Sequence, residues 1–192
     1  LGAIGDAQAV RPLITTLGDS SARPYLRLEA ARILGAFESA EVAHEMLRIV
    51  DSRVVDPFGQ ELAVLVLDLR ADPSFADALV DRLSDRSLPL SARLRMANTL
   101  ASLEARDIIG RLVSLLSDGS FSAQLRGRIA LSLTQLVDAR DGDVLERVSE
   151  ILRTEKDVAE LYTLAWILSE RVGTPVYPGD LGAEALQYPW LE

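Results

Sequence analysis

A repeat of 33 residues constrains the fold of this chain more than any other feature of its sequence. Leucine recurs on this step at five positions: Leu1, Leu34, Leu67, Leu100 and Leu133. Further columns of mostly apolar residues keep the same step and start at Val10, Leu13 and Leu17. After Leu136 the register slips by three residues, and it resumes at Leu145. A fixed period of about 20–50 residues is the signature of a repeat architecture, so we expect each unit to be one supersecondary element.

Each repeat unit contains two stretches with apolar residues at helical spacing, separated by turns rich in Gly, Asp, Ser and Pro. Pro24, Pro57 and Pro89 lie near the start of the first stretch, where a missing backbone N–H costs little. First helices are predicted at residues 23–37, 57–70, 89–103, 122–137 and 157–172. Second helices are predicted at residues 7–18, 40–51, 74–84, 105–117 and 143–153. No stretch alternates apolar and polar residues over a useful length, so no strand is predicted.

The fold class that follows is all-α, an α-solenoid of stacked antiparallel helix pairs. One pair cannot bury its apolar face alone, so neighbouring pairs stack and share a continuous core. The predicted array covers residues 1–172, and its first repeat is expected to be truncated at the N-terminus because Leu1 aligns with Leu34. Residues 173–192 leave the repeat through "GTPVYPGD" and are expected to form a C-terminal cap or a linker to a further domain.

Two stretches carry a family resemblance: "LGAIGDAQAVRPLITTLGD" (residues 1–19) and "RLEAARILGAF" (residues 27–37). The first resembles the HEAT-like repeat first noted in phycobilisome lyases, and the second resembles the first-helix half of that motif. The resemblance extends over about residues 1–172 and implies an armadillo-like helical array. Such arrays serve in lyases, nuclease accessory parts, signalling ATPases, scaffolds and DNA glycosylases, so the resemblance is specific for fold rather than for function.

Three pairs of an aspartate and an arginine, spaced by eight residues, are predicted to bridge neighbouring units: Asp19 with Arg27, Asp85 with Arg93, and Asp118 with Arg126. At the equivalent place another unit has Ser52 and Gln60, so both charges are missing together. Joint loss is expected, because a charge at a packed junction is costly without its partner. The pattern resembles the Asp–Arg ladder between HEAT-like repeats, and we prefer this structural role to an anion-binding row of arginines.

The charge and the residue types of the chain exclude several functions. The net charge of −9 repels phosphate backbones, so we expect no nucleic acid as partner. The chain has no cysteine and one histidine, so neither a disulfide framework nor a zinc site is expected. No apolar run is long enough to cross a bilayer, and no signal peptide is visible. We therefore expect a cytoplasmic protein with no metal, no cofactor and no membrane partner.

No catalytic residue is predicted. His44 is the sole histidine, and no nucleophile motif accompanies it, so a solvated side chain is the expected role. No GxxxxGK[ST] loop is present for nucleotide phosphates. Asp77, Asp81 and Asp85 follow one another at helical spacing, which suits either a cation site or a solvated helix face, and the solvated face is the more common case.

The second helices are expected to line the inner, concave side of the array, as in HEAT-like proteins. Their outward positions on the 33-residue step are mixed in charge and lack aromatic residues, which suits a protein or peptide partner with polar complementarity. The predicted partner-binding residues are His44, Arg48, Asp77, Asp81, Arg111, Ser114 and Arg147. An ordinary solvated surface would have the same composition.

The stretch "ELAVLVLDL" within residues 57–70 is apolar around its whole circumference. A helix of this kind is expected to be buried on all sides. Leu62, Leu65 and Leu69 are therefore predicted to form a patch for self-association or for packing on a missing domain. The alternative is a local rotation of the helix that hides these leucines within the chain's own core.

The function predicted from these features is a non-catalytic scaffold or regulatory module within a larger protein. It would bind a protein or peptide partner through the concave face. The alternative is a subunit of a chromophore-lyase type of enzyme, in which a partner helps to form the active site. A HEAT-like DNA glycosylase ranks lowest, because it would need a basic concave surface with aromatic residues around an acid.

Overall fold

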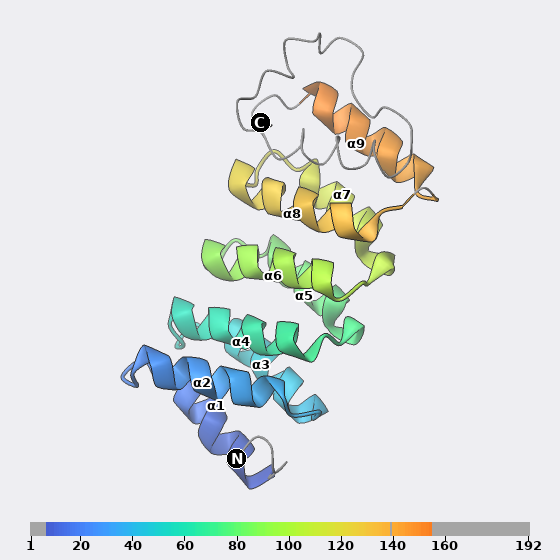
Figure 1. Cartoon of the computed structure of the whole chain (residues 1–192). Helices are drawn as coiled ribbons and strands as arrows, with labels where there is room; N and C mark the ends of the chain where they lie inside the picture. Colours follow the sequence, from blue (N-terminus) through green and yellow to red (C-terminus); the bar gives the residue numbers. More distant parts are fainter. Residues whose placement is uncertain (1–6, 139, 155–192) are drawn as a thin grey trace, which may run out of the picture. The chain divides into compact units, whose positions relative to one another are not determined.

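The computed structural model describes residues 7–138 and 140–154, and within them the chain is helical, with no strand (Figure 1). The α-helices are α1 (Val10–Gly18), α2 (Pro24–Gly35), α3 (Ala40–Val50), α4 (Pro57–Arg70), α5 (Ala76–Ser84), α6 (Leu90–Ser102), α7 (Ile109–Leu116), α8 (Ala123–Leu136) and α9 (Gly142–Thr154). Short 3₁₀ turns at Ala7–Ala9, Pro73–Phe75 and Arg106–Ile108 precede α1, α5 and α7. The predicted truncated start, the helix at 157–172 and the predicted cap at 173–192 fall wholly or largely outside the described residues.

The first residues of several helices explain where these helices begin. Pro24 and Pro57 occupy the first turns of α2 and α4, where proline is compatible with the helix. Asp56 caps α4, because its carboxylate accepts the Gly59 N–H at 2.8 Å. Ser122 caps α8 through the Leu125 N–H at 3.3 Å. Each helix predicted within the described residues is present, and its boundaries lie within a few residues of those expected.

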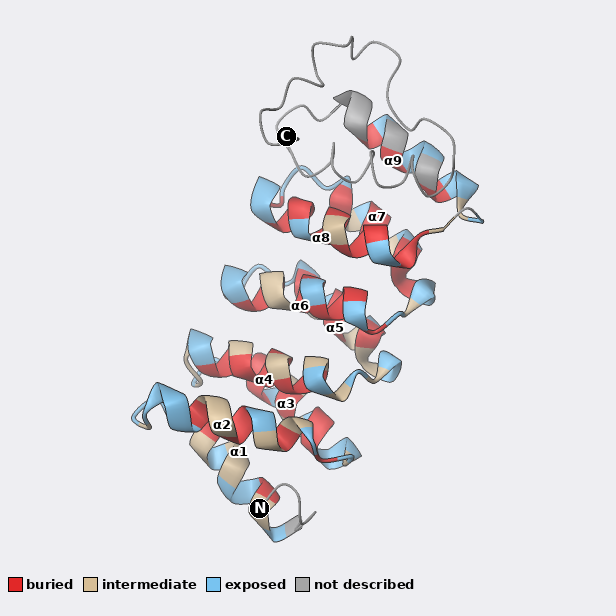
Figure 2. Ribbon diagram, viewed as in Figure 1, coloured by how far each residue is buried: buried red, intermediate tan, exposed pale blue. Residues whose placement is uncertain are grey.

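The chain divides into two compact units, residues 1–108 and 109–192. In the N-terminal unit α2, α4 and α6 pack side by side in one layer, and α1, α3 and α5 form a second layer behind them (Figure 1). Leu34, Leu67 and Leu100 are almost completely buried in this unit, one from each helix of the first layer. The inward faces of both layers are buried and the outward faces exposed, as Figure 2 shows.

In the C-terminal unit α7 packs against α8 and α9. Its core is formed by aliphatic side chains of all three helices: Leu112, Val113, Leu116, Leu125, Ile129, Leu133 and Val148. Leucine, valine and alanine dominate both cores, which suits close packing between helices.

Four neighbouring helices of the same unit cover part of helix α4, which corrects the predicted association patch at Leu62. It contacts α1, α2, α3 and α6. Leu62 is 3% exposed and Leu69 is 50% exposed, with Leu65 half-buried between these extremes. The prediction of three leucines on one surface patch is therefore wrong for Leu62, because neighbouring helices of the same unit already cover that side of α4.

Close approach and side-chain hydrogen bonds connect the first-layer helices. A Cβ atom added at Gly35 of α2 would lie 2.7 Å from the Cβ of Leu69, so α2 and α4 approach closely at this glycine. At the same end of α4 the Arg70 guanidinium donates to the Phe37 carbonyl. Between α4 and α6 the Ser102 hydroxyl donates to the Asp68 carboxylate at 2.7 Å. These contacts fix the register of α2, α4 and α6.

Candidate functional site

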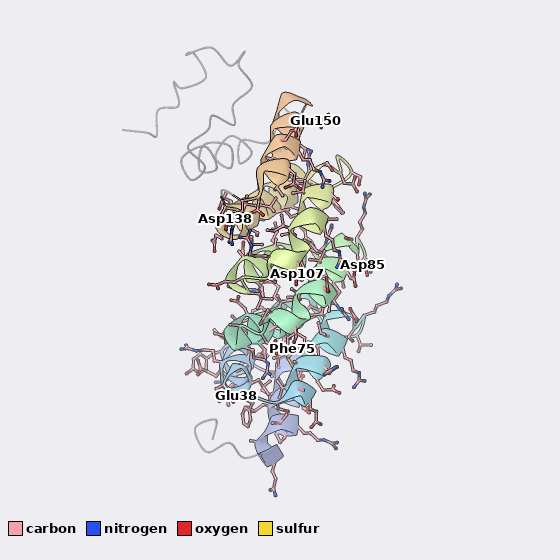
Figure 3. All side chains as sticks on the ribbon, turned by 90° about the vertical axis from the view of Figure 1, so that its right-hand side faces the viewer. Glu38, Phe75, Asp85, Asp107, Asp138 and Glu150 are labelled. Atoms are coloured by element: carbon pink, nitrogen blue, oxygen red, sulfur yellow. The ribbon has the colours of Figure 1, made fainter. Side chains whose placement is uncertain are left out.

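The predicted partner-binding residues lie on second-layer helices in the N-terminal unit and on α7 and α9 in the C-terminal unit. His44 and Arg48 are exposed on α3, and Asp77 and Asp81 are exposed on α5. Figure 3 looks onto the turns that carry Glu38, Phe75 and Asp107, and Asp85 lies to one side of them. The surface of α3 and α5 is polar and mixed in charge, as the sequence predicted.

Ion pairs and local hydrogen bonds organise this surface. Arg48 pairs with Glu45 on the same helix, with Nη1 and Oε1 2.7 Å apart. Arg82 of α5 makes two bonds of 2.8 and 2.7 Å to the Asp51 carboxylate at the end of α3. His44 donates from Nδ1 to the Ala40 carbonyl at 2.8 Å, within its own helix. The histidine is thus an exposed helix residue bonded to its own backbone.

In the C-terminal unit the fold brings two of the predicted residues together. Arg147 of α9 approaches Ser114 of α7, with Nη2 and Oγ 3.5 Å apart. Arg111 is half-buried on α7. Among the described residues no group of three or more histidine, cysteine or acidic side chains could hold a metal ion, and this includes the row Asp77, Asp81 and Asp85. None of the helices described here has the length and hydropathy needed to span a bilayer.

The first predicted Asp–Arg pair needs correction, because Arg27 binds a different aspartate. The Arg27 guanidinium makes two hydrogen bonds to Asp56, at 2.8 and 2.5 Å, and its Nε donates to the Leu17 carbonyl at 2.9 Å. Asp19 instead accepts the Ser21 N–H at 2.9 Å and acts on Arg27 only through longer-range attraction. Arg27 pairs with Asp56 because Asp56 caps α4, which packs beside α2. Asp19 does not pair with Arg27 in this way, because its carboxylate is oriented by the hydrogen bond within its own turn.

The aspartates of the predicted pairs share a role in turns. Asp19, Asp85 and Asp118 each accept the backbone N–H two residues further on, at 2.8 to 2.9 Å. Ser52 does the same for the Val54 N–H with its hydroxyl, at 3.2 Å. Hydrogen bonds from Ser21 and Ser87 hold the pKa of Asp19 and of Asp85 below the ordinary value. The residues at this position of the repeat, three aspartates and one serine, therefore share the role of closing a turn.

The arginines of the predicted pairs share a different role, in which they bind the end of the preceding helix. Arg27 Nε bonds to the Leu17 carbonyl, and Arg93 Nε bonds to the Leu83 carbonyl at 2.8 Å. Gln60 donates from Nε2 to the Val50 carbonyl at 2.8 Å, so it replaces arginine in this role. Asp85 attracts Arg93 electrostatically, and burial lowers the pKa of Arg93. The pairing of Asp118 with Arg126 stays a prediction.

Arg27, Asp56, Phe58 and Gly59 form a cluster that we call the α2/α4 interlock. The Arg27 side chain is 3% exposed, and its guanidinium lies over the Phe58 ring, 5.1 Å from the centroid. A Cβ atom at Gly59 would lie 2.7 Å from Arg27 Nη2, so the glycine makes room for the guanidinium. The hydrogen bond from Arg27 lowers the pKa of Asp56, and the same bond raises the pKa of Arg27.

A groove of about 390 Å³ lies between the turn that precedes α4 and the turn that precedes α6; we call it the loop groove. Its polar lining consists of Asp51, Ser52, Arg53, Gln60, Asp85 and Ser87. Its apolar lining consists of Val55, Pro57, Leu88 and Pro89. The groove is therefore open to solvent and offers both carboxylates and apolar surface within the N-terminal unit.

Exposed apolar side chains lie at or just before the starts of α2, α4 and α6, and the sequence analysis did not identify them. Val54 is 95% exposed beside the groove, and Phe58 and Leu90 are 37% and 40% exposed at the starts of α4 and α6. Tyr25 and Leu26 are also exposed at the start of α2. One signal was available: Tyr25 and Phe58 each follow a proline that begins a helix, 33 residues apart. Aromatic residues at such exposed positions are typical of interaction surfaces.

Comparisons with known proteins add no family assignment. The sequence matches no protein-family model, and no curated protein matches it.

Proposed function

We propose that this chain is a HEAT-like α-solenoid and serves as a non-catalytic protein-interaction module. The repeat supports this proposal through three hydrogen bonds at positions 33 residues apart, in which Arg27, Gln60 and Arg93 each bind the carbonyl ten residues earlier. The layering of α2, α4 and α6 over α1, α3 and α5 supports it too. Stacked helix pairs present long surfaces that suit polypeptide partners.

The observation that carries the functional proposal is the state of the second-layer surface. His44, Arg48, Asp77 and Asp81 are all exposed, whereas Met46 of α3 and Leu79 and Val80 of α5, which lie between them in the sequence, are buried. The packed core thus holds these two helices in place, and their outward side chains do not take part in the packing of that core. We infer that a polypeptide binds across α3 and α5. Arg111, Ser114 and Arg147 belong to the C-terminal unit and stay predicted partner-binding residues of that unit by itself.

A photo-crosslinking experiment tests this function. The chain is produced with a photoreactive phenylalanine analogue at Asp77 or at Arg48, and with the same analogue at Arg32 as control. Arg32 is exposed on α2, which belongs to the other layer. We expect one discrete crosslinked partner from positions 77 and 48 and none from position 32. Equal crosslinking from all three positions, or none from positions 48 and 77, would contradict the proposal.

A further inference from the structure

Equivalent residues differ sharply between two neighbouring helix junctions, and this difference accounts for the loop groove. Where α2 meets α4, Arg27 and Asp56 fill the space between the helix starts. Where α4 meets α6, the residues 33 positions later are Gln60 and Pro89, and both line the groove. Glutamine is shorter than arginine, and proline carries no carboxylate. The second junction therefore lacks the guanidinium and the carboxylate that fill the first, and it has Ala92 where the first has Gly59.

The exposed carboxylate of Asp85 is the group of the groove lining that can bind a cation. Gln60 donates to the Val50 and Ser52 carbonyls, so its amide is turned toward the backbone. Asp85 faces the groove with its Oδ1 bonded to the Ser87 N–H at 2.8 Å. Asp51 is held by Arg82, whereas Asp85 is attracted both by Arg53, which is exposed on the groove lining, and by the buried Arg93 of α6. The hydrogen bonds from Ser87 keep the pKa of Asp85 low, so its carboxylate is charged at neutral pH.

The apolar residues in and beside the groove indicate how long a bound side chain can be and which residues can flank it in a partner. Val55, Pro57, Leu88 and Pro89 offer contact to a hydrocarbon stem. Val54, Phe58 and Leu90 adjoin lining residues in the sequence and are exposed. A volume of about 390 Å³ is near the lower limit of about 300–1,000 Å³ for ligand pockets, which suits one long side chain rather than a helix.

We propose that the loop groove binds an arginine side chain of a partner polypeptide, flanked in that partner by apolar residues. The inferred guanidinium lies within the loop groove and pairs with Asp85, which lines it. Arginine fits better than lysine, because its planar guanidinium is weakly hydrated and binds a carboxylate through two parallel bonds. This inference rests on the proposed function, since it names the chemistry of a polypeptide partner, but it concerns a different surface from the α3 and α5 face.

The test is a titration of the isotope-labelled full chain with the peptide acetyl-Leu-Arg-Leu-amide, followed by nuclear magnetic resonance. The control peptide carries citrulline, which has the shape of arginine without its charge. We expect shifts of the Ser52, Arg53 and Ser87 amides with the arginine peptide, and at least tenfold weaker binding of the citrulline peptide. Equal binding of the two peptides, or shifts elsewhere only, would overturn the proposal.

Two variants make the test specific. Asp85→Asn removes the charge and keeps an oxygen that accepts the Ser87 N–H, and we expect binding at least tenfold weaker. Asp19→Asn is the matched control, because Asp19 closes the same kind of turn but does not line the loop groove. If Asp19→Asn weakens binding as much as Asp85→Asn does, the proposed pairing is wrong.

A third variant fills the groove from within. Gln60→Arg combined with Pro89→Asp and Ala92→Gly supplies the cation, the carboxylate and the glycine of the α2/α4 interlock, so it should fold and lose the peptide. Undiminished binding by this folded variant would overturn the proposal, and the Asp85→Asn comparison decides the question if the variant does not fold. Shifts of the same amides with protein concentration alone would assign the groove to a second copy, against the proposal. If the analogue at position 77 crosslinks a partner but the arginine peptide does not bind the groove, this inference is refuted and the proposed function stands.

Discussion

Two glycines of the chain occupy similar positions near the starts of helices but have opposite surroundings. Gly59 lies in the first turn of α4, and a Cβ atom there would lie 2.5 Å from Val55 Cγ1 and 2.7 Å from Arg27 Nη2. Gly110 lies at the start of α7, and nothing lies within 4 Å of an added Cβ. Glycine in a helix normally costs about 0.5–1 kcal/mol relative to alanine, so a contact must favour it at position 59.

Gly59→Ala is expected to lower the free energy of unfolding by about 1–3 kcal/mol, because the new methyl group overlaps packed atoms. Gly110→Ala should instead raise the free energy of unfolding by up to about 1 kcal/mol. Urea unfolding followed by circular dichroism measures both changes. A gain in stability at position 59 would mean that the α2/α4 interlock tolerates a side chain there.

A buried hydroxyl in α6 offers a second prediction at the scale of one residue. Thr99 is 1% exposed, and its Oγ1 has no hydrogen-bond partner among the described protein atoms. The residue 33 positions earlier is Val66. Thr99→Val should stabilise the protein by about 1 kcal/mol, because an unsatisfied buried hydroxyl is removed without a change of shape. Thr134→Val is the control, since the Thr134 hydroxyl bonds to the Leu131 carbonyl, and it should give no gain in the same urea experiment.

At the scale of helices, the α2/α4 interlock joins two helices through an ion pair with two hydrogen bonds. Asp56→Asn is expected to lower the free energy of unfolding by about 1–3 kcal/mol, because the buried Arg27 loses its counter-charge. Arg27→Gln should cost less, since Gln60 shows that glutamine can still bind the preceding carbonyl. A double-mutant cycle measures the coupling, and the double variant should lose less than the sum of the single losses. Strictly additive losses would show that the two residues do not stabilise each other.

The same pair predicts how stability depends on pH. Arg27 lowers the pKa of Asp56 below the unfolded value of about 3.9, so the unfolded state binds more protons as the pH falls. The contribution of Asp56 is then complete above about pH 5 and is lost as the pH falls through the folded pKa. Wild type should therefore converge on Asp56→Asn between about pH 5 and pH 2 in urea unfolding. A difference in the free energy of unfolding between the two proteins that stays constant over this range would contradict the lowered pKa of Asp56. The other carboxylates do not affect this difference, because both proteins carry them.

Helix positions could be predicted from the sequence because their signals are local. The helix predicted at residues 57–70 is α4, with Pro57 in its first turn and Asp56 as its cap. Apolar spacing likewise gave the bounds of α3 and α5 to within a few residues. The burial of Leu62 could not be predicted in this way, because it depends on which neighbouring helices cover α4.

The partner of Arg27 and the loop groove were missed for a related reason. Asp56 lies 29 residues from Arg27, so only the packing of α4 beside α2 brings the two together. The spacing of eight residues between Asp19 and Arg27 suggested a pair, but Asp19 satisfies its own turn. The groove depends on atoms that Gln60 and Pro89 lack, and repeat comparison reveals this only after the role of Arg27 is known.

At the scale of the whole molecule, the chain consists of two compact units with separate cores. In repeat proteins each unit is stabilised mainly by its own contacts and by those to its nearest neighbours. A fragment of residues 1–108 should therefore retain helical circular dichroism and unfold cooperatively in urea, with a smaller denaturant dependence than the full chain. A fragment without helical signal would show that the N-terminal unit depends on the rest of the chain.

The crowding at Gly59 also restricts the order in which this junction can change over evolutionary time. A side chain at position 59 meets both Val55 and Arg27, so changes at positions 55 and 27 that make room for it have to come first. The equivalent positions of the next junction are Gln60, Pro89 and Ala92, so a side chain replaces the glycine where the arginine and the aspartate are both absent. Lineages that keep arginine and aspartate at positions 27 and 56 should retain glycine at position 59, and the three positions should covary as a set.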